Sequence, residues 1–596
     1  MRLRFCLACT VLCVIICLTG CGNQAPLPLS VSVSPQSTAT AAGQTVQVKA
    51  TVTNTKTGVA LPATASSGPQ GVTWSTTEGT VDDNGNFTAP SGTTSSTAVV
   101  TATSRNNPAA VASATIHVVA PGQVSQTANP QVALYSIAPA GTASVSIQFG
   151  SDTTYGLTTW SQPTPPSGGT SSLLVAGMKA NTTYHMRAVV QFADGIQYLD
   201  QDQTFLTGAM PTQQFPVITV TTTPGTTPQS GVELLDVVNG ASTAAPPAVT
   251  DLSGNVLWSY NPGISGVEAN PIKLLANGHF LINFSNGAYD GVNSTLQEVD
   301  LTGALVWQMT AAALNSALAA ATCSGCNITV VGTHHDFAAL PNGHLIVIAA
   351  TQQIISGTTV TGDVIIDLDQ NHKPVWLWNE FDHLDVNRQP MGFPDWTHTN
   401  AVIYSADDGN LIVSMRHQNW LVKIDYANGS GAGDIIWKLG YQGDFTLVGG
   451  TDPTDWFYAQ HGPSFTTTNT SGKFSLILFD NGNDRVFGSG VTCGTSGEPA
   501  CLYSTAPLLQ LDEAAKTATI EFNPTAATYS SFGGNAAVLK NGNVEYCESA
   551  GGPGVAGDIY EITQDNTAQT VWHMVVAGQF AYRGQRIPSL YPGIQW

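Results

Sequence analysis

Hydrophobic and polar residues alternate in short stretches along the chain from about residue 30 onward. Between 30 and 119 such stretches include QTVQVKATV, STAVVTATS and ASATIHVVA, and turn residues separate them. A second set, over 122–209, includes ASVSIQFG and YHMRAVVQF. Period-two alternation bounded by Gly, Pro and Asn is typical of β-strands, and short strands at regular spacing predict sandwiches. We therefore expect two β-sandwich modules, followed by a Thr/Pro-rich connector over 211–228.

A repeated pattern extends over 229–596. Its unit is an Asn-Gly turn, a hydrophobic strand, a strand ending in Asp, a second turn and a strand ending in Trp. The end of the unit begins at positions 251, 300, 367 and 425, with weaker copies at 512 and 563. Six copies of roughly 60 residues predict a six-bladed β-propeller. One apolar stretch, 310–321, interrupts the pattern and is expected to be an inserted helix. The fold class is therefore all-β, with the two sandwiches preceding the propeller.

The first residues have the features of an export signal. Arg2 and Arg4 precede an apolar run over 5–18, which is too short to span a bilayer comfortably. The LTGC sequence that ends at Cys21 resembles a bacterial lipobox. We expect a lipoprotein signal peptide over 1–21, lipidation of Cys21, and a bacterial cell-envelope location with a lipid anchor in a membrane. A simple secretory signal and a membrane span remain the second and third alternatives.

Charge and cysteine content narrow the choice of function. Lys and Arg total 19 against 40 Asp and Glu, and only 10% of residues are charged. This acidic balance argues against nucleic acid as a partner, because nucleic-acid binding needs clustered basic residues. In an oxidising compartment the natural local disulfides are Cys323–Cys326 and Cys493–Cys501, which leaves Cys547 unpaired. A zinc site at Cys323 and Cys326 is disfavoured because no second CxxC exists.

Four polar clusters lie at comparable positions in successive repeats. They are THHD (333–336), DWTHTN (395–400), SMRHQ (414–418) and FYAQHGPSF (457–465). Equivalent strand ends of a propeller converge on one end of its channel, so these residues can line one pocket. Converging histidines can bind a transition metal, act as acid and base, or act as nucleophile beside an anion-binding Arg. The third option uses Arg416 as well, and no HxH or HExxH pattern supports the metal.

The motifs of the repeat region resemble those of the bacterial arylsulfotransferase family, and the resemblance covers 229–596. They are HHDF followed by LPNG, DW-x-H-x-N, S-x-RHQ, W-x-LG, QH, FDNGN-x-R at 479–485 and YRGQRIPSLYPG at 582–593. In the first module, GVTWS followed by GTVDDNGNFTAP resembles a bacterial immunoglobulin-like repeat of the Big type. The MKANTTYHMRAVVQF stretch of the second module is similar to fibronectin type III domains.

The family resemblance implies a reaction and a set of residues. The reaction is ping-pong transfer of a sulfuryl group from a phenolic sulfate to a phenol through a sulfated histidine, without a nucleotide donor, metal or other cofactor. His461 matches the nucleophile, and His335 (or its neighbour His334), His398 and Arg416 match residues that hold the sulfate oxygens and assist proton transfer. Further substrate-binding residues are expected among the following: His334, His417, Asn400 and Arg485.

Two other functions remain open. One is a metal-dependent propeller hydrolase similar to a lactonase, and the other is a non-catalytic surface protein in which propeller and sandwiches form an adhesion array. The N-terminal β-domain of the arylsulfotransferase family is not evident in this sequence. A homodimer is therefore left as a possibility without a defined geometry.

Overall fold

The computed structural model describes residues 27–61, 71–165, 169–210, 215–238, 246–264, 267–285, 291, 293–488, 490, 492, 501–550 and 556–596. The expected signal peptide with Cys21 lies outside the described residues, as does Cys493. Strands account for 51% of the residues and helices for 4%, which confirms the all-β class. Among the described residues, no helix combines the length and the apolar character needed to cross a bilayer.

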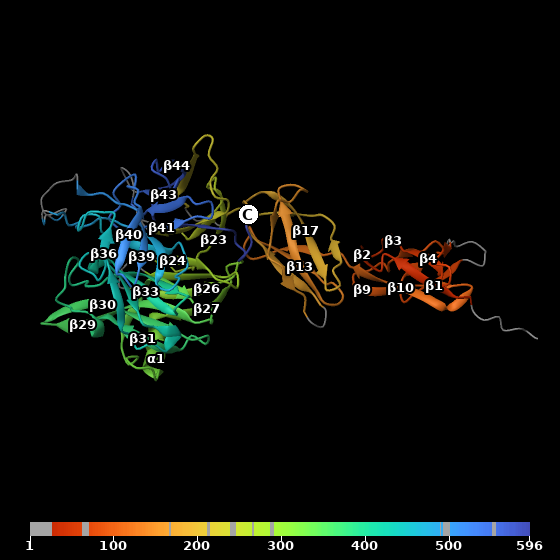
Figure 1. Ribbon diagram of the computed structural model, residues 1–596, viewed down its shortest axis with the longest axis horizontal. Helices are drawn as coiled ribbons and strands as arrows, with labels where there is room; N and C mark the ends of the chain where they lie inside the picture. Colours follow the sequence, from red (N-terminus) through yellow and green to blue (C-terminus); the bar gives the residue numbers. More distant parts are fainter. Residues whose placement is uncertain are drawn as a thin grey trace, which may run out of the picture.

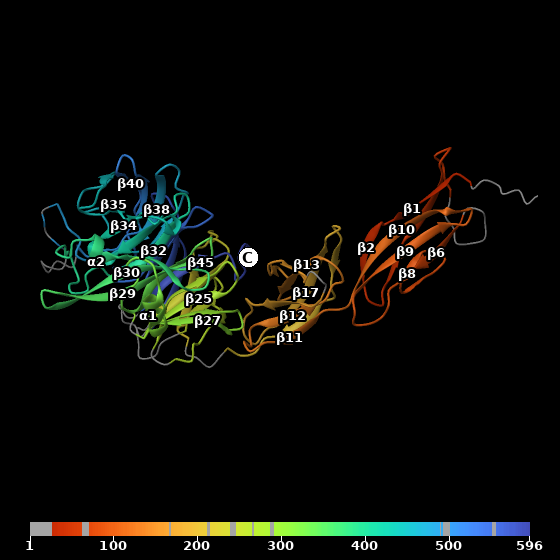
Figure 2. The same ribbon diagram turned by 90° about the horizontal axis from the view of Figure 1, so that it is seen from below.

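Three bodies follow one another along the long axis of the molecule (Figure 1). The view turned by 90° shows the same linear order (Figure 2). The first body, drawn in red to orange, packs its strands around a core that includes Val52, Phe87 and Val100. Its sheets contain β1 (Leu29–Ser34), β4 (Lys49–Asn54) and β5 (Ala60–Leu61); β2 (Ser37–Ala41), β10 (Asn107–Val119), β9 (Ser96–Ser104) and β6 (Val72–Thr76); and β3 (Thr45–Gln47), β8 (Asn86–Thr88) and β7 (Thr80–Val81).

The second body packs two sheets around a core that includes Tyr135, Phe149 and Met186. Its strands are β11 (Gln123–Gln126), β12 (Ala133–Ile137) and β16 (Ser171–Val175) in one sheet, and β14 (Leu157–Thr158), β13 (Ala143–Gly150), β17 (Thr183–Phe192) and β18 (Gln197–Leu199), with β15 (Gln162–Pro163) and β19 (Gln203–Leu206), in the other. His117 of the first body stacks on Phe192 of the second, with ring centroids 3.8 Å apart. The two bodies therefore touch through side chains.

The described part of the third body contains six sheets, whose strands pair antiparallel except that 446–448 joins one sheet in parallel. The first three are β45 (Phe580–Ile587), β21 (Val232–Val238), β22 (Ala248–Thr250) and β23 (Val256–Ser259); β24 (Glu268–Leu274), β25 (Phe280–Ser285), β26 (Thr295–Val299) and β27 (Leu305–Thr310); and β28 (Val330–Ala339), β29 (Leu345–Ile355), β30 (Thr358–Leu368) and β31 (Pro374–Asn379). The next three are β32 (Thr399–Ser405), β33 (Asn410–Met415), β34 (Trp420–Ile424) and β35 (Ile435–Leu439); β37 (His461–Phe465), β38 (Lys473–Phe479), β39 (Leu508–Asp512), β40 (Thr517–Phe522) and β36 (Thr446–Val448); and β41 (Asn535–Val538), β42 (Val544–Glu548), β43 (Ala556–Ile562), β44 (Thr570–Ala577) and β20 (Val217–Thr222).

Helices are short insertions in this body. The expected helix is present as α1 (Ala311–Ala320), and the hydroxyl of Thr310 caps its first turn by accepting from Ala313 N–H. The others are α2 (Glu380–His383) and the 3₁₀ turns η1 (Arg416–Gln418) and η2 (Ala427–Gly429). The sequence loses its period-two alternation at α1. This helix lies between two sheets and leaves the strand order within each of them unchanged.

The two ends of the third body are joined by strand pairing. β21, near its start, pairs antiparallel with β45, the last strand. β20 pairs with β44, so residues expected to be a connector are part of a sheet. Buried Arg586 reinforces this closure by ion pairs to Glu233, Glu545 and Glu561. The last strands of the third body therefore pair with its first strands, and this pairing joins the two ends of the body that contains the site.

The cysteines have different environments. Cys323 and Cys326, in the loop after α1, form a disulfide with Cα atoms 5.4 Å apart. Cys501 is disulfide-bonded, and its expected partner Cys493 is not among the described residues. Cys547 is a free, buried thiol, and burial raises its pKa well above the usual value. A buried neutral thiol is a poor nucleophile, so Cys547 has a packing role.

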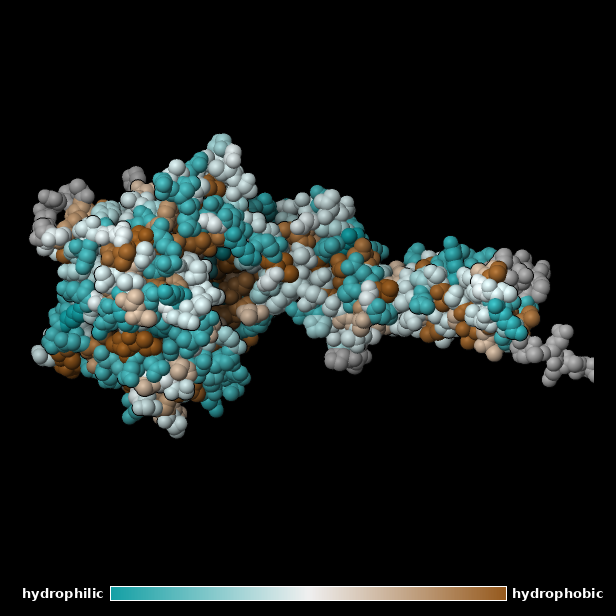
Figure 3. All heavy atoms as spheres, in the orientation of Figure 1, coloured by the Kyte–Doolittle hydropathy of each residue, from teal (hydrophilic) through white to brown (hydrophobic). Residues whose placement is uncertain are grey.

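A cavity of about 390 Å³ lies at the junction of the second and third bodies. It is lined from the second body by Trp160 and Leu174 and from the third by His279 and Tyr591. The space-filling view shows brown, apolar surface where the large body meets the middle one (Figure 3). The junction is therefore a packed contact and not an extended linker.

Candidate active site

Three neighbouring sheets of the third body bring histidines together from their first strands. His335 lies in β28, His398 directly precedes β32, and His461 begins β37. The ring centroids of His335 and His398 are 4.8 Å apart, and Tyr582 of β45 lies 5.8 Å from His335 and 6.0 Å from His461. Residues more than 60 positions apart therefore share one site, as the repeat pattern predicts.

β-Bulges aim these side chains. The pairing register shifts between Thr333 and Phe337 in β28, between Thr399 and Ala401 in β32, and between His461 and Ser464 in β37. His335 and His398 also have left-handed backbone angles, with φ of 55° and 49°. Such angles are uncommon outside glycine and concentrate at functional sites, where bulges redirect side chains.

The tautomer of His461 is set by two hydrogen-bond acceptors. Its Nδ1 lies 2.6 Å from Oδ1 of Asn481 and 3.1 Å from the carbonyl of Ala459, so Nδ1 carries the proton. The Asn481 amide group donates to the carbonyls of Ser530 and Gly533, which fixes its oxygen toward the imidazole. The lone pair is therefore on Nε2, where Gly533 N–H donates over 3.3 Å. Burial first, and then the nearby Arg416, hold the pKa of His461 well below its usual value, so the ring is neutral at pH 7.

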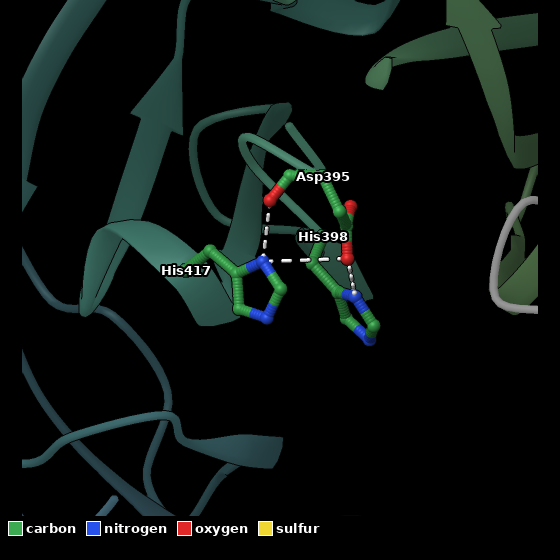
Figure 4. A group of neighbouring side chains, drawn as sticks. All are labelled: Asp395, His398 and His417. Atoms are coloured by element: carbon green, nitrogen blue, oxygen red, sulfur yellow. Dashed lines mark hydrogen bonds and ion pairs between the residues drawn. The ribbon is translucent and has the colours of Figure 1, made fainter. Parts of the chain in front are cut away.

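Asp395 orients two further imidazoles (Figure 4). Nδ1–H of His398 donates to its carboxylate over 2.5 Å, and Nδ1–H of His417 donates to its backbone carbonyl over 2.6 Å. Nε2 of His417 then accepts from a guanidinium N–H of Arg416 over 2.5 Å. Burial, with help from Arg416, lowers the pKa of His417 to about 4, which matches its role as a neutral acceptor. His417 therefore positions Arg416 within the cluster.

Asp395, His398 and His417 offer ligand atoms within 4.8 Å of one another, which is a spacing that could hold a metal ion. In the structure, however, the Nδ1 atoms on that side donate hydrogen bonds to Asp395. The guanidinium of Arg416 is also bonded to His417, and its positive charge opposes a cation there. The donor set therefore fits an Asp–His pair beside an anion site better than it fits a metal.

The structure distinguishes the two histidines of THHD. His335 contacts His398 and Tyr582, whereas both ring nitrogens of His334 bond to protein atoms, at Asp363 and His335. His334 is 3% exposed and lies behind its neighbour. In this structure His334 has a supporting position, and its expected role in substrate binding stays a prediction.

Arg485 and Asn400 also have supporting contacts. The Arg485 guanidinium bonds to Asp480 and to the carbonyls of Thr454 and Trp456, so it braces the loop that carries Asn481 and does not face the histidines. Substrate contact by Arg485 stays a prediction, because its position in FDNGN-x-R gives no direction for the side chain. Asn400 donates to the carbonyl of Gln460, the residue before His461, while its buried Oδ1 has no hydrogen-bond partner in the part of the chain that the structure describes.

The sequence reasoning missed Asn481, Tyr582 and Arg583 as site residues, although two quoted motifs contain them. Arg583 pairs with Asp336 at 3.2 Å and donates to the carbonyl of Asn400. Burial raises the pKa of Tyr582 above its usual value, so its hydroxyl stays protonated. The FDNGN and YRGQ motifs contain these residues and could have indicated them. Their roles, however, depend on contacts between different sheets of the third body.

Four guanidinium groups among the described residues, those of Arg416, Arg485, Arg583 and Arg586, have a buried donor without a hydrogen-bond acceptor, and two of them lie at the cluster. Nε of Arg416 and Nε of Arg583 have no hydrogen-bond partner among the described residues. A buried unsatisfied donor costs about 1–3 kcal/mol. Both charges lie close enough to lower the pKa values of His335 and His461, after the larger effect of burial. The arrangement suits an anionic group that supplies acceptor oxygens next to neutral imidazoles.

Comparison with known proteins gives a match to one family and likenesses to solved structures. A sequence model described as "Arylsulfotransferase (ASST)" matches residues 220–583. No curated protein matches the chain. Among solved structures, a Pseudomonas aeruginosa periplasmic gluconolactonase is similar at 11% identity and TM-score 0.30, covering 57% of this chain and 94% of that one. A Synechocystis apocarotenoid oxygenase mutant is similar at 13% identity and TM-score 0.29, covering 78% and 94%. At these TM-scores the two likenesses bear on neither the fold nor the activity of this chain.

Proposed function

The chain belongs to the arylsulfotransferase family, and from that premise we propose that it transfers a sulfuryl group from a phenolic sulfate ester to a phenol through sulfated His461. The observation that carries this proposal is the lone pair on Nε2 of His461, which lies near two guanidinium groups with unused donors. A neutral imidazole is a competent nucleophile, and the guanidinium groups suit the oxygens of the transferred group.

In the donor half-reaction, Nε2 of His461 attacks sulfur. The N–S bond forms, the S–O bond to the aryl group breaks, and the aryl oxygen takes the electron pair. Sulfuryl transfer resembles phosphoryl transfer with less charge, so positioning and donors to the oxygens dominate. Arg416 and Arg583 supply those donors. A phenol has a pKa of about 10, so the phenolate departs more easily when it receives the proton that an imidazole took from the acceptor of the preceding turnover.

In the acceptor half-reaction, the phenol oxygen attacks the same sulfur. The N–S bond breaks, its electron pair returns to Nε2 of His461, and the proton of the phenol goes to an imidazole. His335 presents Nε2 for this purpose, because its Nδ1 is used in a hydrogen bond to His334. One site therefore serves both half-reactions and produces ping-pong kinetics without a cofactor.

The first test is turnover of a chromogenic aryl sulfate with and without added phenol. We expect release of the chromophore that depends on phenol. His461→Asn should abolish transfer and leave folding intact, whereas Arg416→Ala should lower the rate by about 10²–10³-fold, as for loss of one oxyanion donor. After incubation with donor alone, mass spectrometry should find one sulfuryl group on the His461 peptide.

His344 provides a matched control, because it pairs with Asp367 in the same body and is absent from the cluster. His344→Asn should transfer at close to the wild-type rate. An active His461→Asn enzyme, or a sulfuryl group trapped on His335 or His398, would contradict the assignment.

The two alternative functions have distinct outcomes in the same experiments. A metal-dependent hydrolase would lose activity with a chelator and would contain a stoichiometric metal. A non-catalytic adhesion protein would turn over no aryl sulfate. The lone support for the hydrolase is the spacing of Asp395, His398 and His417, and the hydrogen bonds within that group disfavour it.

For the fold we propose a six-bladed β-propeller over 229–596, with β20 added to its last blade. Support comes from the six sheets, in which every described strand pair but β36 with β40 is antiparallel, and from the pairing of β21 with β45. We propose that 30–119 is a Big-type immunoglobulin-like domain and 122–209 a fibronectin type III-like domain, on the strength of their sequence motifs. Both would act as spacers between the propeller and the membrane. A homodimer remains a possibility to be checked by mass measurement in solution.

Export and lipidation at Cys21 complete the proposal, with the protein held at a membrane of the bacterial cell envelope. The LTGC sequence after an apolar run supports it. Cys21→Ser should release the protein from the membrane fraction or block its processing. If the variant is processed normally and still sediments with membranes, the anchor is a different one.

A further inference from the structure

A chain of three side chains extends from the cluster into the third body. His335 lies at the cluster, and its Nδ1 is 2.7 Å from Nδ1 of His334. Nε2 of His334 is in turn 2.9 Å from Oδ1 of Asp363, in β30. His334 and Asp363 are 3% and 2% exposed, so water does not compete for these contacts. The mechanism described above uses neither of them.

The hydrogen bonds around Asp363 define where the protons are. Its second oxygen accepts from the backbone N–H of Thr399 over 2.7 Å and from the hydroxyl of Thr397 over 3.1 Å. Burial first, and then the charge of Asp363, raise the pKa of neighbouring Glu380 well above its usual value. This favours the neutral form of Glu380, while the donors from Thr397 and Thr399 mark Asp363 as an acceptor.

These contacts determine both histidine tautomers. His334 donates Nε2–H to Asp363, so its Nδ1 has a lone pair and accepts Nδ1–H of His335. Nε2 of His335 is then unprotonated and can accept a proton. With one more proton the order reverses: His334 becomes an imidazolium, its Nδ1–H donates to His335, and His335 becomes a neutral donor at Nε2.

The surroundings favour the positive charge on His334. Burial, followed by His334, His461, Arg583 and Arg416, holds the pKa of His335 well below its usual value. A charge on His335 therefore faces two guanidinium groups, whereas a charge on His334 lies against a carboxylate at 2.9 Å.

Resting on the proposed sulfuryl transfer, we propose that Asp363, His334 and His335 form a proton relay. In it, Nε2 of His335 alternates between accepting and donating a proton while the positive charge stays on His334. His334 and Asp363 are positioning residues, because neither touches substrate. The relay stores the proton of the acceptor phenol and delivers it to the next leaving phenolate.

In the acceptor half-reaction the relay moves two protons. The phenol oxygen bonds to sulfur, the N–S bond breaks, and its electron pair returns to His461. The phenol proton goes to Nε2 of His335, and the Nδ1 proton of His335 moves to Nδ1 of His334. In the next donor half-reaction the Nε2 proton of His335 goes to the departing aryl oxygen, and the proton on Nδ1 of His334 returns to Nδ1 of His335.

Other ionisable groups also influence the relay, and they come from every element packed around it. They are Asp336 in β28, Glu380 in α2, Asp395 and His398 before β32, Arg416 and His417 in η1, His461 in β37, Tyr582 and Arg583 in β45, Lys273 in β24 and Asp236 in β21. A pH profile alone therefore does not isolate the relay, and the experiment must compare acceptors at one pH.

Asp363→Asn tests the relay. Thr397 and Thr399 both donate to Oδ2 of Asp363, so in the variant the amide oxygen should take that position and the amide nitrogen should face His334. The amide N–H then donates to Nε2 of His334, which reverses the direction of both hydrogen bonds of the relay without adding charge. His335 is then held as a donor that cannot accept. We expect kcat/KM for unsubstituted phenol as acceptor to fall by about 10²–10⁴-fold, the range of general acid–base catalysis. For an acidic nitrophenol, which is already ionised, the loss should be about tenfold or less.

Asp367→Asn is the matched control. Asp367 lies on the same strand β30 and accepts from His344 over 3.0 Å, outside the cluster. This variant should affect both acceptors equally and little. An equal loss for the two acceptors in Asp363→Asn would assign Asp363 a structural role and overturn the relay, as would an unchanged rate.

A second measurement needs no turnover. In protein labelled with ¹⁵N at histidine, the nitrogen shifts report which ring nitrogen carries the proton. Wild-type protein, at a pH high enough that the relay has lost its extra proton, should show His334 as the Nε2–H tautomer and His335 as the Nδ1–H tautomer, assigned with His334→Gln and His335→Gln. Asp363→Asn should invert both. Wild-type protein without that pattern contradicts the relay, whereas the pattern without any aryl-sulfate turnover contradicts only the proposed function.

Discussion

Asp236, in β21, is an acid held close to the cations of the site. It is 3% exposed and accepts the backbone N–H of Ile272 over 2.9 Å. Burial raises its pKa to about 7, although Arg583 and Lys273 oppose the shift. These two cations pair with Asp336 at 3.2 and 2.5 Å. At the scale of single residues, the site therefore has beside its cations a carboxyl group whose pKa is raised to about 7.

This carboxyl group predicts a pH dependence of stability. A folded-state pKa above the unfolded value favours the folded state at low pH, and that contribution is lost as pH rises from about 4 through 7. Asp236→Asn keeps the acceptor for Ile272 and cannot ionise. Its free energy of unfolding relative to wild type should increase between pH 5 and 7, by at most about 1.4 kcal/mol per pH unit. Urea unfolding at several pH values checks this.

Asp382→Asn serves as the control, because Asp382 is an exposed residue of α2 in the same body. Its unfolding free energy should follow the wild-type pH dependence. Parallel curves for Asp236→Asn and wild type would show that Asp236 does not titrate in this range.

At the scale of elements, bulged strands make the site. The strands β28, β32 and β37 are predictable from alternation, but their register shifts are not. The glycine after His461 has φ of 50°, and a Cβ there would lie 2.5 Å from the Cβ of Asn535. Gly462 therefore lets β37 approach β41 closely. Bulges and this close approach turn ordinary strand ends into converging imidazoles.

At the scale of the whole molecule, residues near the C-terminus connect the second and third bodies. The label C lies between these bodies in Figure 1. Trp596 donates its indole N–H to the carbonyl of Thr158 and packs edge-on to Phe149. Tyr591 donates to the carbonyl of Leu174 and accepts from Ala176 N–H. Both aromatic residues therefore tie the second body to the third.

Trp596→Ala should loosen this connection. Loss of a largely buried side chain costs about 2 kcal/mol, and here the loss falls on the contact between bodies. We expect the thermal transitions of the two bodies to separate in calorimetry and the maximum dimension from X-ray scattering to increase. Aryl-sulfate turnover should be unchanged, because Trp596 contacts no residue of the cluster. Unaltered calorimetry and scattering would show that Trp596 is not needed for the connection.

The sequence by itself determined the all-β class, the inserted helix and the polar clusters that carry the chemistry. Alternation and turn residues act over a few positions, so the strands can be read locally. The motif set was specific enough to indicate the family. In the same way, His461 and Arg416 stood out because their residue types and neighbours already suggested a nucleophile beside an anion site.

Only the tertiary structure decided which partners those residues have. It placed His335 at the cluster with His334 behind it, turned Arg485 toward Asp480, and brought Asn481 to His461. Asp363 is 29 positions from His334, and their contact depends on the pairing of β28, β29 and β30. Hydrogen-bond partners far apart in sequence follow from strand register and bulges, and these are set by packing of the whole body and not by local pattern.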